Sequence, residues 1–88
     1  MFDDLKDRAV VVTGGVTGIG GAASLAFAAA GARVLAQYLG GIGEADKMEA
    51  KGIATLQLDL TNPGAPAALM TEARRRLGRI DEIGRAHV

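Results

Sequence analysis

Residues 10–21 read VVVTGGVTGIGG, and this stretch decides the fold. Three β-branched valines lead into a threonine, and five glycines follow within eight positions. An unbroken apolar run of this kind is typical of a strand that is buried on both faces. The glycines require a separate explanation, because glycine weakens regular structure unless the backbone conformation or a close approach demands it. We interpret them as a loop that binds a phosphate group.

The spacing of the glycines supports this interpretation. Gly14, Gly18 and Gly20 form G-x-x-x-G-x-G between a predicted strand at residues 9–13 and a predicted helix at residues 18–30. Dinucleotide-binding loops occur in this strand-to-helix context. Without a Cβ, the loop can turn sharply and a pyrophosphate can reach backbone N–H groups. The start of the following helix would add unpaired N–H donors and a partial positive charge.

Two other glycine motifs do not fit. A P-loop needs G-x-x-x-x-G-K-[ST]; Gly15 and Gly20 have that spacing, but Gly21 stands where the lysine should be. The common fingerprint G-x-G-x-x-G is also absent. A purely structural glycine turn in another α/β protein is the remaining alternative.

The pattern T-G-x-x-x-G-x-G resembles the cofactor loop of the short-chain dehydrogenases/reductases. The loop residues that carry this resemblance are Thr13, Gly14, Gly18, Ile19 and Gly20. It implies an oxidoreductase that binds NAD(P)(H) and transfers a hydride between nicotinamide and an alcohol or carbonyl substrate. The candidate cofactor-binding residues of the loop are Gly14, Val16, Thr17, Gly18, Ile19 and Gly20.

The end of the second predicted strand, residues 33–38, bears on which cofactor is bound. Dinucleotide-binding α/β units usually place an Asp or Glu there, about 20 residues after the glycines, to hold the ribose 2′-OH of NAD. Here the positions are Gln37 and Tyr38, which are cofactor-binding candidates, and neither would repel a 2′-phosphate. The absence of an acidic residue favours NADP over NAD. In the resembled family, members that prefer NADP often carry a basic residue at the positions of Thr17 and Leu39, and neither residue is basic here. Tyr38 fits adenosine contact and coverage of the sheet edge equally well.

The third predicted strand, residues 53–58, leads into Asp59 and Leu60. In the resembled family an acidic residue followed by an aliphatic one contacts the adenine ring at this place, so Asp59 and Leu60 are cofactor-binding candidates. An equally good interpretation is that Asp59 closes a turn before Asn62 and Pro63, because Asp side chains commonly bond to the backbone two residues on.

Two further helices are predicted. Residues 44–51 form a short charged helix, and residues 63–77 form a longer one. Thr61 and Asn62 are capping candidates for the longer helix, with Pro63 in its first turn. The residues that recur at helical spacing and should face the sheet are Ala67, Leu69, Met70, Ala73 and Leu77.

Arginines at 74–76, with Arg79, form the only dense basic patch of the sequence. No aromatic residues interleave with them, and Glu72, Asp81 and Glu82 lie beside them, which is a poor pattern for binding nucleic acid. Cations at the C-terminal end of a helix complement its dipole. We therefore expect a structural role for this patch and no nucleic-acid partner.

Gly78 to Asp81 resemble the family's lead into its fourth strand, and the resemblance runs from Leu5 to Asp81. Residues 82–88, EIGRAHV, then replace the apolar stretch and N-N-A-G that the family would continue with. Their codons can be written GAG ATC GGA AGA GCA CAC GTC, which resembles a widely used sequencing adapter. We therefore predict that residues 1–81 are the N-terminal half of an NAD(P)-binding Rossmann domain, that residues 82–88 are a non-native tail, and that His87 has no function.

The expected fold class is α/β. It is a partial Rossmann-type, doubly wound parallel sheet with the order β-α-β-α-β-α along the chain and the strand order 3-2-1, truncated before strand 4. The apolar strand at residues 9–13 would then have a free edge, from which we expect marginal stability, self-association or no independent fold.

Composition limits the class of protein further. The 88 residues allow one domain at most, and with 49% hydrophobic but 3% aromatic residues the core must be built from Ala, Leu, Val and Ile. Ten basic and ten acidic residues balance, which leaves no field to attract nucleic acid or an anionic membrane. With no cysteine and no apolar run near ~20 residues, we expect no thiolate metal site, no membrane span and a cytoplasmic location.

The sequence does not match the catalytic groups of the resembled family, which are a tyrosine acting as general acid/base, a lysine, a serine and an asparagine. Tyr38 cannot be that tyrosine, because Ile42 stands at the lysine position of Y-x-x-x-K. Ser24 lies inside the first predicted helix without a partner base. We therefore assign no catalytic residue and no metal ligand.

Three functions follow from these patterns. The preferred one is the cofactor-binding fragment of an NAD(P)-dependent short-chain oxidoreductase, inactive alone. The resemblance implies that its parent is a homo-oligomer acting on a small-molecule substrate. The alternatives are a stand-alone dinucleotide-binding or regulatory module, and an interaction or nucleic-acid-binding protein that uses the arginine patch.

Overall fold

The computed structural model describes residues 6–85, in which strands and helices alternate. In chain order the elements are β1 (Ala9–Thr13), α1 (Gly18–Ala29), β2 (Arg33–Tyr38), α2 (Ile42–Ala50), β3 (Ala54–Gln57), α3 (Ala65–Leu77) and β4 (Glu82–Arg85). Leu5 and His87, on which two of the expectations rest, lie outside the described residues.

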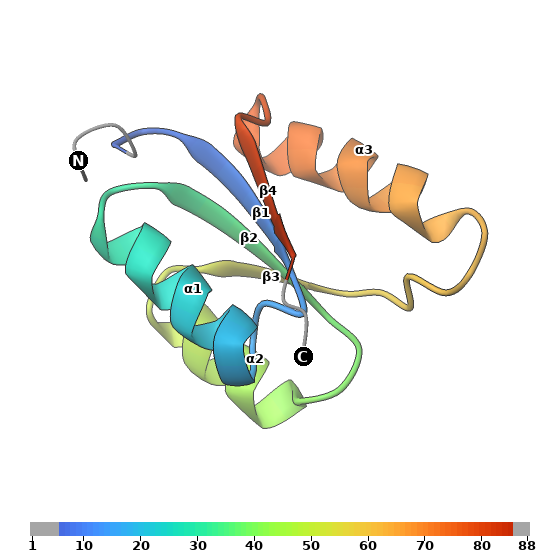
Figure 1. Cartoon of the computed structure of the whole chain (residues 1–88), viewed down its shortest axis with the longest axis horizontal. Helices are drawn as coiled ribbons and strands as arrows, with labels where there is room; N and C mark the ends of the chain where they lie inside the picture. Colours follow the sequence, from blue (N-terminus) through green and yellow to red (C-terminus); the bar gives the residue numbers. More distant parts are fainter. Residues whose placement is uncertain (1–5, 86–88) are drawn as a thin grey trace.

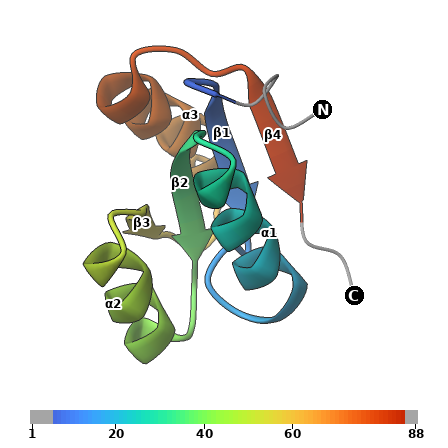
Figure 2. The same cartoon turned by 90° about the vertical axis from the view of Figure 1, so that its left-hand side faces the viewer.

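The strands form one parallel sheet in the order β3-β2-β1-β4. Helices α1 and α2 cover one face, and α3 covers the other (Figures 1 and 2). This is the doubly wound arrangement that the alternating pattern predicts, and the predicted order 3-2-1 is confirmed for the first three strands.

The prediction that the fold stops before a fourth strand is wrong. Residues 82–85 form β4, which pairs with β1 in a register that runs from Val10 opposite Glu82 to Thr13 opposite Arg85. Pairing uses backbone N–H and C=O groups, which almost every residue type carries, so a segment without the family's apolar pattern can still add to the sheet. The free edge predicted for β1 is therefore absent.

The alternation of side chains along β1 divides the core into two clusters. Val10 and Val12 point to the face of α1 and α2, whereas Ala9 and Val11 point to the face of α3. The first cluster contains Val10, Val12, Val16, Val34, Ala36, Ala45, Met48 and Ile53. The second contains Ala9, Val11, Leu35, Leu69, Ala73 and Leu77. Burial on both faces explains why β1 reads as an uninterrupted apolar run.

Helix α3 begins later than predicted. Gly64 is its N-cap, in place of Thr61 or Asn62, and Pro66 rather than Pro63 lies in its first turn. The Asn62 carbonyl accepts a hydrogen bond of 3.0 Å from the Ala65 N–H, so a turn occupies the segment expected to start the helix.

The buried face of α3 is also shifted relative to the prediction. Ala67 is exposed, so the prediction that it faces the sheet is wrong. Met70 is half-buried, so its prediction is confirmed only in part. The buried residues recur at every fourth position and are Ala65, Leu69, Ala73 and Leu77.

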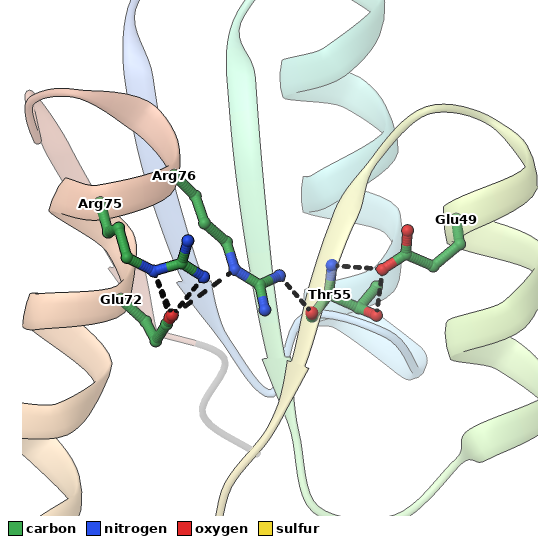
Figure 3. A network of polar contacts seen from close by, with 5 residues as sticks. All are labelled: Glu49, Thr55, Glu72, Arg75 and Arg76. Carbon is green, nitrogen blue, oxygen red and sulfur yellow. Dashed lines mark hydrogen bonds and ion pairs between the residues drawn. The ribbon is translucent and has the colours of Figure 1, made fainter.

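Side chains from α2 and α3 meet at β3, which is an edge strand (Figure 3). One oxygen of the Glu49 carboxylate accepts from the Thr55 N–H at 2.8 Å and from its hydroxyl at 2.7 Å. The Arg76 guanidinium donates to the Thr55 carbonyl at 3.0 Å. Glu72 pairs with Arg75 at 2.6 Å and approaches Arg76 to 4.0 Å. This network ties both helices to the edge strand.

Candidate functional site

The predicted cofactor residues lie at or directly after the carboxyl ends of β1, β2 and β3. In a parallel sheet these ends lie at one edge, where open α/β folds bind their ligands. The structure therefore brings the glycine loop after Thr13, the end of β2 and the segment after Gln57 to the same edge (Figure 1).

Gly15 is fixed tightly within the loop. Its N–H donates to the Gln37 backbone carbonyl at 2.8 Å, and its carbonyl accepts from the Ser24 hydroxyl at 2.7 Å. A Cβ at this position would lie 2.6 Å from the Val12 carbonyl oxygen and 2.9 Å from the Ala36 Cβ. Only glycine fits here, because the loop passes directly over β1 and β2.

Gln37 holds the loop from a second direction. Its side-chain oxygen accepts from the Gly14 N–H at 2.9 Å, and its side-chain nitrogen donates to the Leu58 carbonyl at 2.6 Å. The residue is 5% exposed. Because β2 lies between β1 and β3, one carboxamide can reach the loops that follow both neighbouring strands. Its polar atoms are thus engaged by the protein.

The helix start after the loop is uncapped. Thr17 is the N-cap of α1, yet its side chain makes no capping bond, and no acidic residue lies in the first turn. The first intrahelical bond runs from the Gly21 N–H to the Thr17 carbonyl at 2.9 Å. The N–H groups of residues 18–20 precede that bond and, by helix geometry, have no intrahelical acceptor. Together with the helix dipole they are suited to an anion.

Gly18 completes the approach to this helix start. Its φ is +53°, a left-handed conformation that favours glycine, and an added Cβ would meet nothing within 4 Å. The space above Gly18 is therefore open to a ligand. Fixed glycines at the beginning of the loop and an open one at the helix start suit a backbone cradle for phosphate oxygens.

Large apolar side chains are exposed around the cradle. Ile19, Leu39 and Ile42 are 64%, 57% and 57% exposed, and they follow β1 or β2 at the same edge of the sheet. By contrast, the side chain of Val16 is buried in the core, so only the backbone of this predicted contact residue could reach a ligand. Thr17 is exposed and Gly20 is buried.

Tyr38 is half-buried and packs against the core on the side of α1 and α2. This agrees with its interpretation as a cover of the sheet edge. Its backbone carbonyl accepts from the Leu58 N–H at 2.9 Å, which extends the contact between β2 and the segment after β3. Adenosine contact by the Tyr38 ring stays a prediction.

Asp59 closes the turn that its sequence context suggests. One carboxylate oxygen accepts from the Thr61 hydroxyl at 2.6 Å and from the Thr61 N–H at 2.9 Å. The hydroxyl and then the backbone N–H of Thr61 stabilise the charged form and lower the pKa of Asp59. Leu60 packs against the core below α3. The turn is confirmed, and adenine contact by Asp59 and Leu60 stays a prediction.

Ser24 and the side chain of Gln37 hold the loop in ways that motif reading missed. Both are buried polar residues in otherwise apolar elements, AASLAF and RVLAQY. A buried polar group must find a partner, and this signal was available in the sequence. In the described part of the chain no buried side-chain nitrogen or oxygen lacks a hydrogen-bond partner.

The arginine patch has internal partners. Arg75 and Arg76 contact Glu72, and Arg79 bonds to Asp81 at 3.0 Å. These pairs support the structural role expected for the patch. Within residues 6–85 no group of three His, Cys, Asp or Glu side chains is placed to hold a metal ion, and no helix is long and apolar enough to cross a membrane.

A family model and several known proteins match most of this chain. The model of the family described as short chain dehydrogenase matches residues 8–84, so the likeness passes the Asp81 limit drawn from the motifs. The uncharacterized oxidoreductase YghA of Escherichia coli (strain K12) is 39% identical over 85 residues, which cover 88% of this chain and 29% of the relative. The 1-deoxy-11-beta-hydroxypentalenate dehydrogenase of Streptomyces avermitilis is 40% identical over 84 residues, covering 90% of this chain and 31% of the relative.

Solved structures share the fold. The aldohexose dehydrogenase of Thermoplasma acidophilum, in ligand-free form, superposes with a TM-score of 0.81 at 29% identity, covering 98% of this chain and 31% of that one. The NADH-dependent reductase A1-R′, complexed with NAD, gives a TM-score of 0.79 at 27% identity, covering 94% and 37%. The chain thus spans only about a third of the length of these relatives. Its glycine loop, sheet order and family match together show that it belongs to the short-chain dehydrogenase/reductase family.

Proposed function

We propose that this chain is the NAD(P)(H)-binding portion of a short-chain oxidoreductase that transfers a hydride between nicotinamide and an alcohol or carbonyl substrate. The observation that carries the proposal is the uncapped start of α1, which lies behind a glycine loop fixed by its own hydrogen bonds. Such a helix start attracts the pyrophosphate of a dinucleotide. The bound nicotinamide would supply the hydride chemistry.

The proposed contacts divide among three segments. Backbone groups of residues 16–20 would surround the pyrophosphate, with Gly14 making the turn into the loop. At the end of β2, Tyr38 would lie near the adenosine ribose, whereas the Gln37 side chain is engaged by the backbone of Gly14 and Leu58. Asp59 and Leu60 would contact adenine. A contact set of this extent fits a sheet edge that already presents exposed apolar side chains.

We assign no catalytic residue to the chain and propose that it is inactive alone. Hydride transfer, a small-molecule substrate, a homo-oligomeric state and a cytoplasmic location are proposed for a full-length parent. The competing function is a dinucleotide-binding module without catalysis. Reading the source gene through the Asp81 codon separates the two: N-N-A-G followed by Y-x-x-x-K supports the oxidoreductase, and a genuine stop codon after Val88 favours the module. The same reading tests the adapter origin of residues 82–88.

The direct test is calorimetric titration of the chain with NADPH and NADH, using Ile19→Glu as the critical variant and Ile19→Gln as its control. Ile19 is exposed in the first turn of α1, where an acidic side chain favours the helix dipole. The same charge repels a pyrophosphate, so we expect Ile19→Glu to fold normally yet lose at least about tenfold in affinity. Equal affinities of the two variants would overturn the proposed phosphate site.

We also propose that NADP is preferred over NAD, because no acidic residue stands at the end of β2. Tyr38→Asp places a carboxylate there, and Tyr38→Asn provides a similar shape without charge. We expect the aspartate variant to lower the ratio of NADPH affinity to NADH affinity by about tenfold or more, because its carboxylate repels the 2′-phosphate. If the asparagine variant changes the ratio equally, the charge argument fails.

A further inference from the structure

The carboxamide of Gln37 joins two segments that belong to opposite ends of the proposed cofactor site. Its oxygen accepts from Gly14, where the phosphate loop begins, and its nitrogen donates to Leu58, directly before the proposed adenine contacts. We propose that Gln37 is a positioning residue: it sets the spacing between the phosphate loop and the adenine end, and does not itself contact the cofactor. This inference rests on the proposed dinucleotide function.

The geometry demands both halves of the carboxamide. A Gly14 N–H needs an acceptor and a Leu58 carbonyl needs a donor, and among uncharged side chains of this length only glutamine offers one of each. Because Gln37 is 5% exposed, solvent is poorly placed to replace either bond. Loss of the carboxamide would leave two backbone groups without their partners.

Backbone bonds run parallel to the side-chain bonds and show what the carboxamide adds. The Gly15 N–H donates to the Gln37 carbonyl at 2.8 Å, and the Leu58 N–H donates to the Tyr38 carbonyl at 2.9 Å. These bonds attach each loop to β2 separately. The carboxamide links one loop to the other through a single rigid group, so it fixes their mutual distance before a ligand arrives. Preorganisation of this kind reduces the ordering cost of binding.

Engagement of Gly14 also divides the glycines by role. Its N–H points to Gln37, so this donor is taken before a phosphate binds. The donors that remain for the ligand include those of residues 18–20 at the helix start. The carboxamide therefore both shapes the loop and selects which of its N–H groups face the pyrophosphate.

The first test replaces Gln37 with methionine, which keeps the length of the side chain and removes both hydrogen bonds. The matched control is Gln57→Met on the neighbouring strand, where the carboxamide donates to the Leu39 carbonyl at 3.0 Å in an exposed setting. We expect Gln37→Met to weaken NADPH and NADH binding alike, each by about tenfold, and to speed hydrogen exchange at the Gly14 amide. Gln57→Met should change neither.

The second test uses pH to restore the missing donor. Glutamate at position 37 accepts from Gly14 in either protonation state, but only its protonated form can donate to Leu58. Burial raises the pKa of such a carboxyl, so protonation should occur in mildly acidic solution. We expect the affinity of Gln37→Glu for NAD, divided by that of the native chain at each pH, to rise as pH falls from about 8 to about 5.

Other titrating groups do not imitate this rescue. The ionisable residues next to the two ends of the bridge are Tyr38 and Asp59, and Thr61 lowers the pKa of Asp59, so its carboxyl stays charged over this range. The register also places Arg85 of β4 opposite Thr13, two strands from β2. Dividing by the native affinity removes the contributions of all three.

The outcomes separate the inference from the function beneath it. If the native chain binds no dinucleotide, the proposed function fails and the inference fails with it. If the native chain binds but Gln37→Met binds equally well, only the inference fails. If Gln37→Met does not fold, Gln37→Glu decides: recovery at acidic pH supports a positioning role, and an affinity ratio that is flat with pH overturns it.

Discussion

The polar groups at the amino ends of the strands have different partners from those at the carboxyl ends. At the amino ends of the strands, the Asp81 carboxylate accepts from the Ala9 N–H at 2.9 Å and from Arg79 at 3.0 Å. Arg33 donates to the carbonyl of Leu77 at the end of α3. The charged side chains of Asp81, Arg79 and Arg33 thus have partners within the chain.

At the carboxyl ends, the loop after β1 is held by uncharged bonds from Ser24 and Gln37, and the helix start behind it has no side-chain cap. Apolar side chains such as Ile19 stand exposed beside it. At the amino ends, the charged side chains are paired within the chain. At the carboxyl ends, hydrogen bonds hold the loop backbone, but the first N–H groups of α1 have no intrahelical acceptor. Substitutions at the two ends can therefore compare how much each set of contacts contributes to folding stability.

The largest expected effect breaks the firm backbone of the carboxyl end. Gly15→Ala would place a Cβ 2.6 Å from the Val12 carbonyl oxygen, so the loop must move. We expect a loss of about 1–3 kcal/mol in the free energy of unfolding, measured by urea denaturation. Gly43→Ala is the control, because Gly43 lies inside α2 with open space around its Cβ position. That change should stabilise the chain by about 0.4–1 kcal/mol. Equal signs for the two variants would refute the close approach.

A somewhat smaller effect is expected at the partner of Gly15. Ser24→Ala removes the donor of a fully buried 2.7 Å bond and leaves the Gly15 carbonyl without it. The free energy of unfolding should fall by about 1–3 kcal/mol, toward the lower end because alanine also favours the helix. Thr17→Ala, which removes a hydroxyl that makes no capping bond, should change stability far less. The two effects being the same would mean that the Ser24 bond does not hold the loop.

The smallest effect is expected at the amino end, and it depends on pH. The Ala9 N–H, and then Arg79 and Arg8, stabilise the charged form of Asp81 and lower its pKa. A carboxyl with a lowered pKa adds stability above its ordinary pKa, and that stability is lost as pH falls through the lowered value. Asp81→Asn should therefore destabilise the chain slightly at neutral pH, with a difference that vanishes in acid. A difference that persists below the pKa would point to shape instead of charge.

The sequence predicted β1, β2 and α1 better than it predicted α3 and β4. The expected strands at residues 9–13 and 33–38 coincide with β1 and β2, and α1 ends one residue before its expected limit. These elements have strong apolar patterns and clear glycine boundaries. The start of α3 was missed because the turn at Asn62 competes with capping, a choice that local residue preferences do not decide.

The roles of individual side chains were harder to predict. A strand pattern shows that Gln37 is buried, but not that the backbone of Gly14 on one side and of Leu58 on the other lies within its reach. That depends on strand order and register, which are properties of the whole sheet. Likewise, β4 was missed because its pairing depends on the unpaired backbone of β1 and not on the side chains of residues 82–85.

The network around β3 has a consequence for how chains meet. In a parallel strand, alternate residues turn both backbone groups away from the neighbouring strand, and at this edge Thr55 is such a residue. Its N–H is taken by Glu49 and its carbonyl by Arg76 (Figure 3), while the N–H of Ile53 bonds to the Met48 carbonyl. A foreign strand arriving there finds these groups occupied. At Ile53 and Thr55 this margin of the sheet thus offers fewer free backbone groups to the strand addition that begins aggregation.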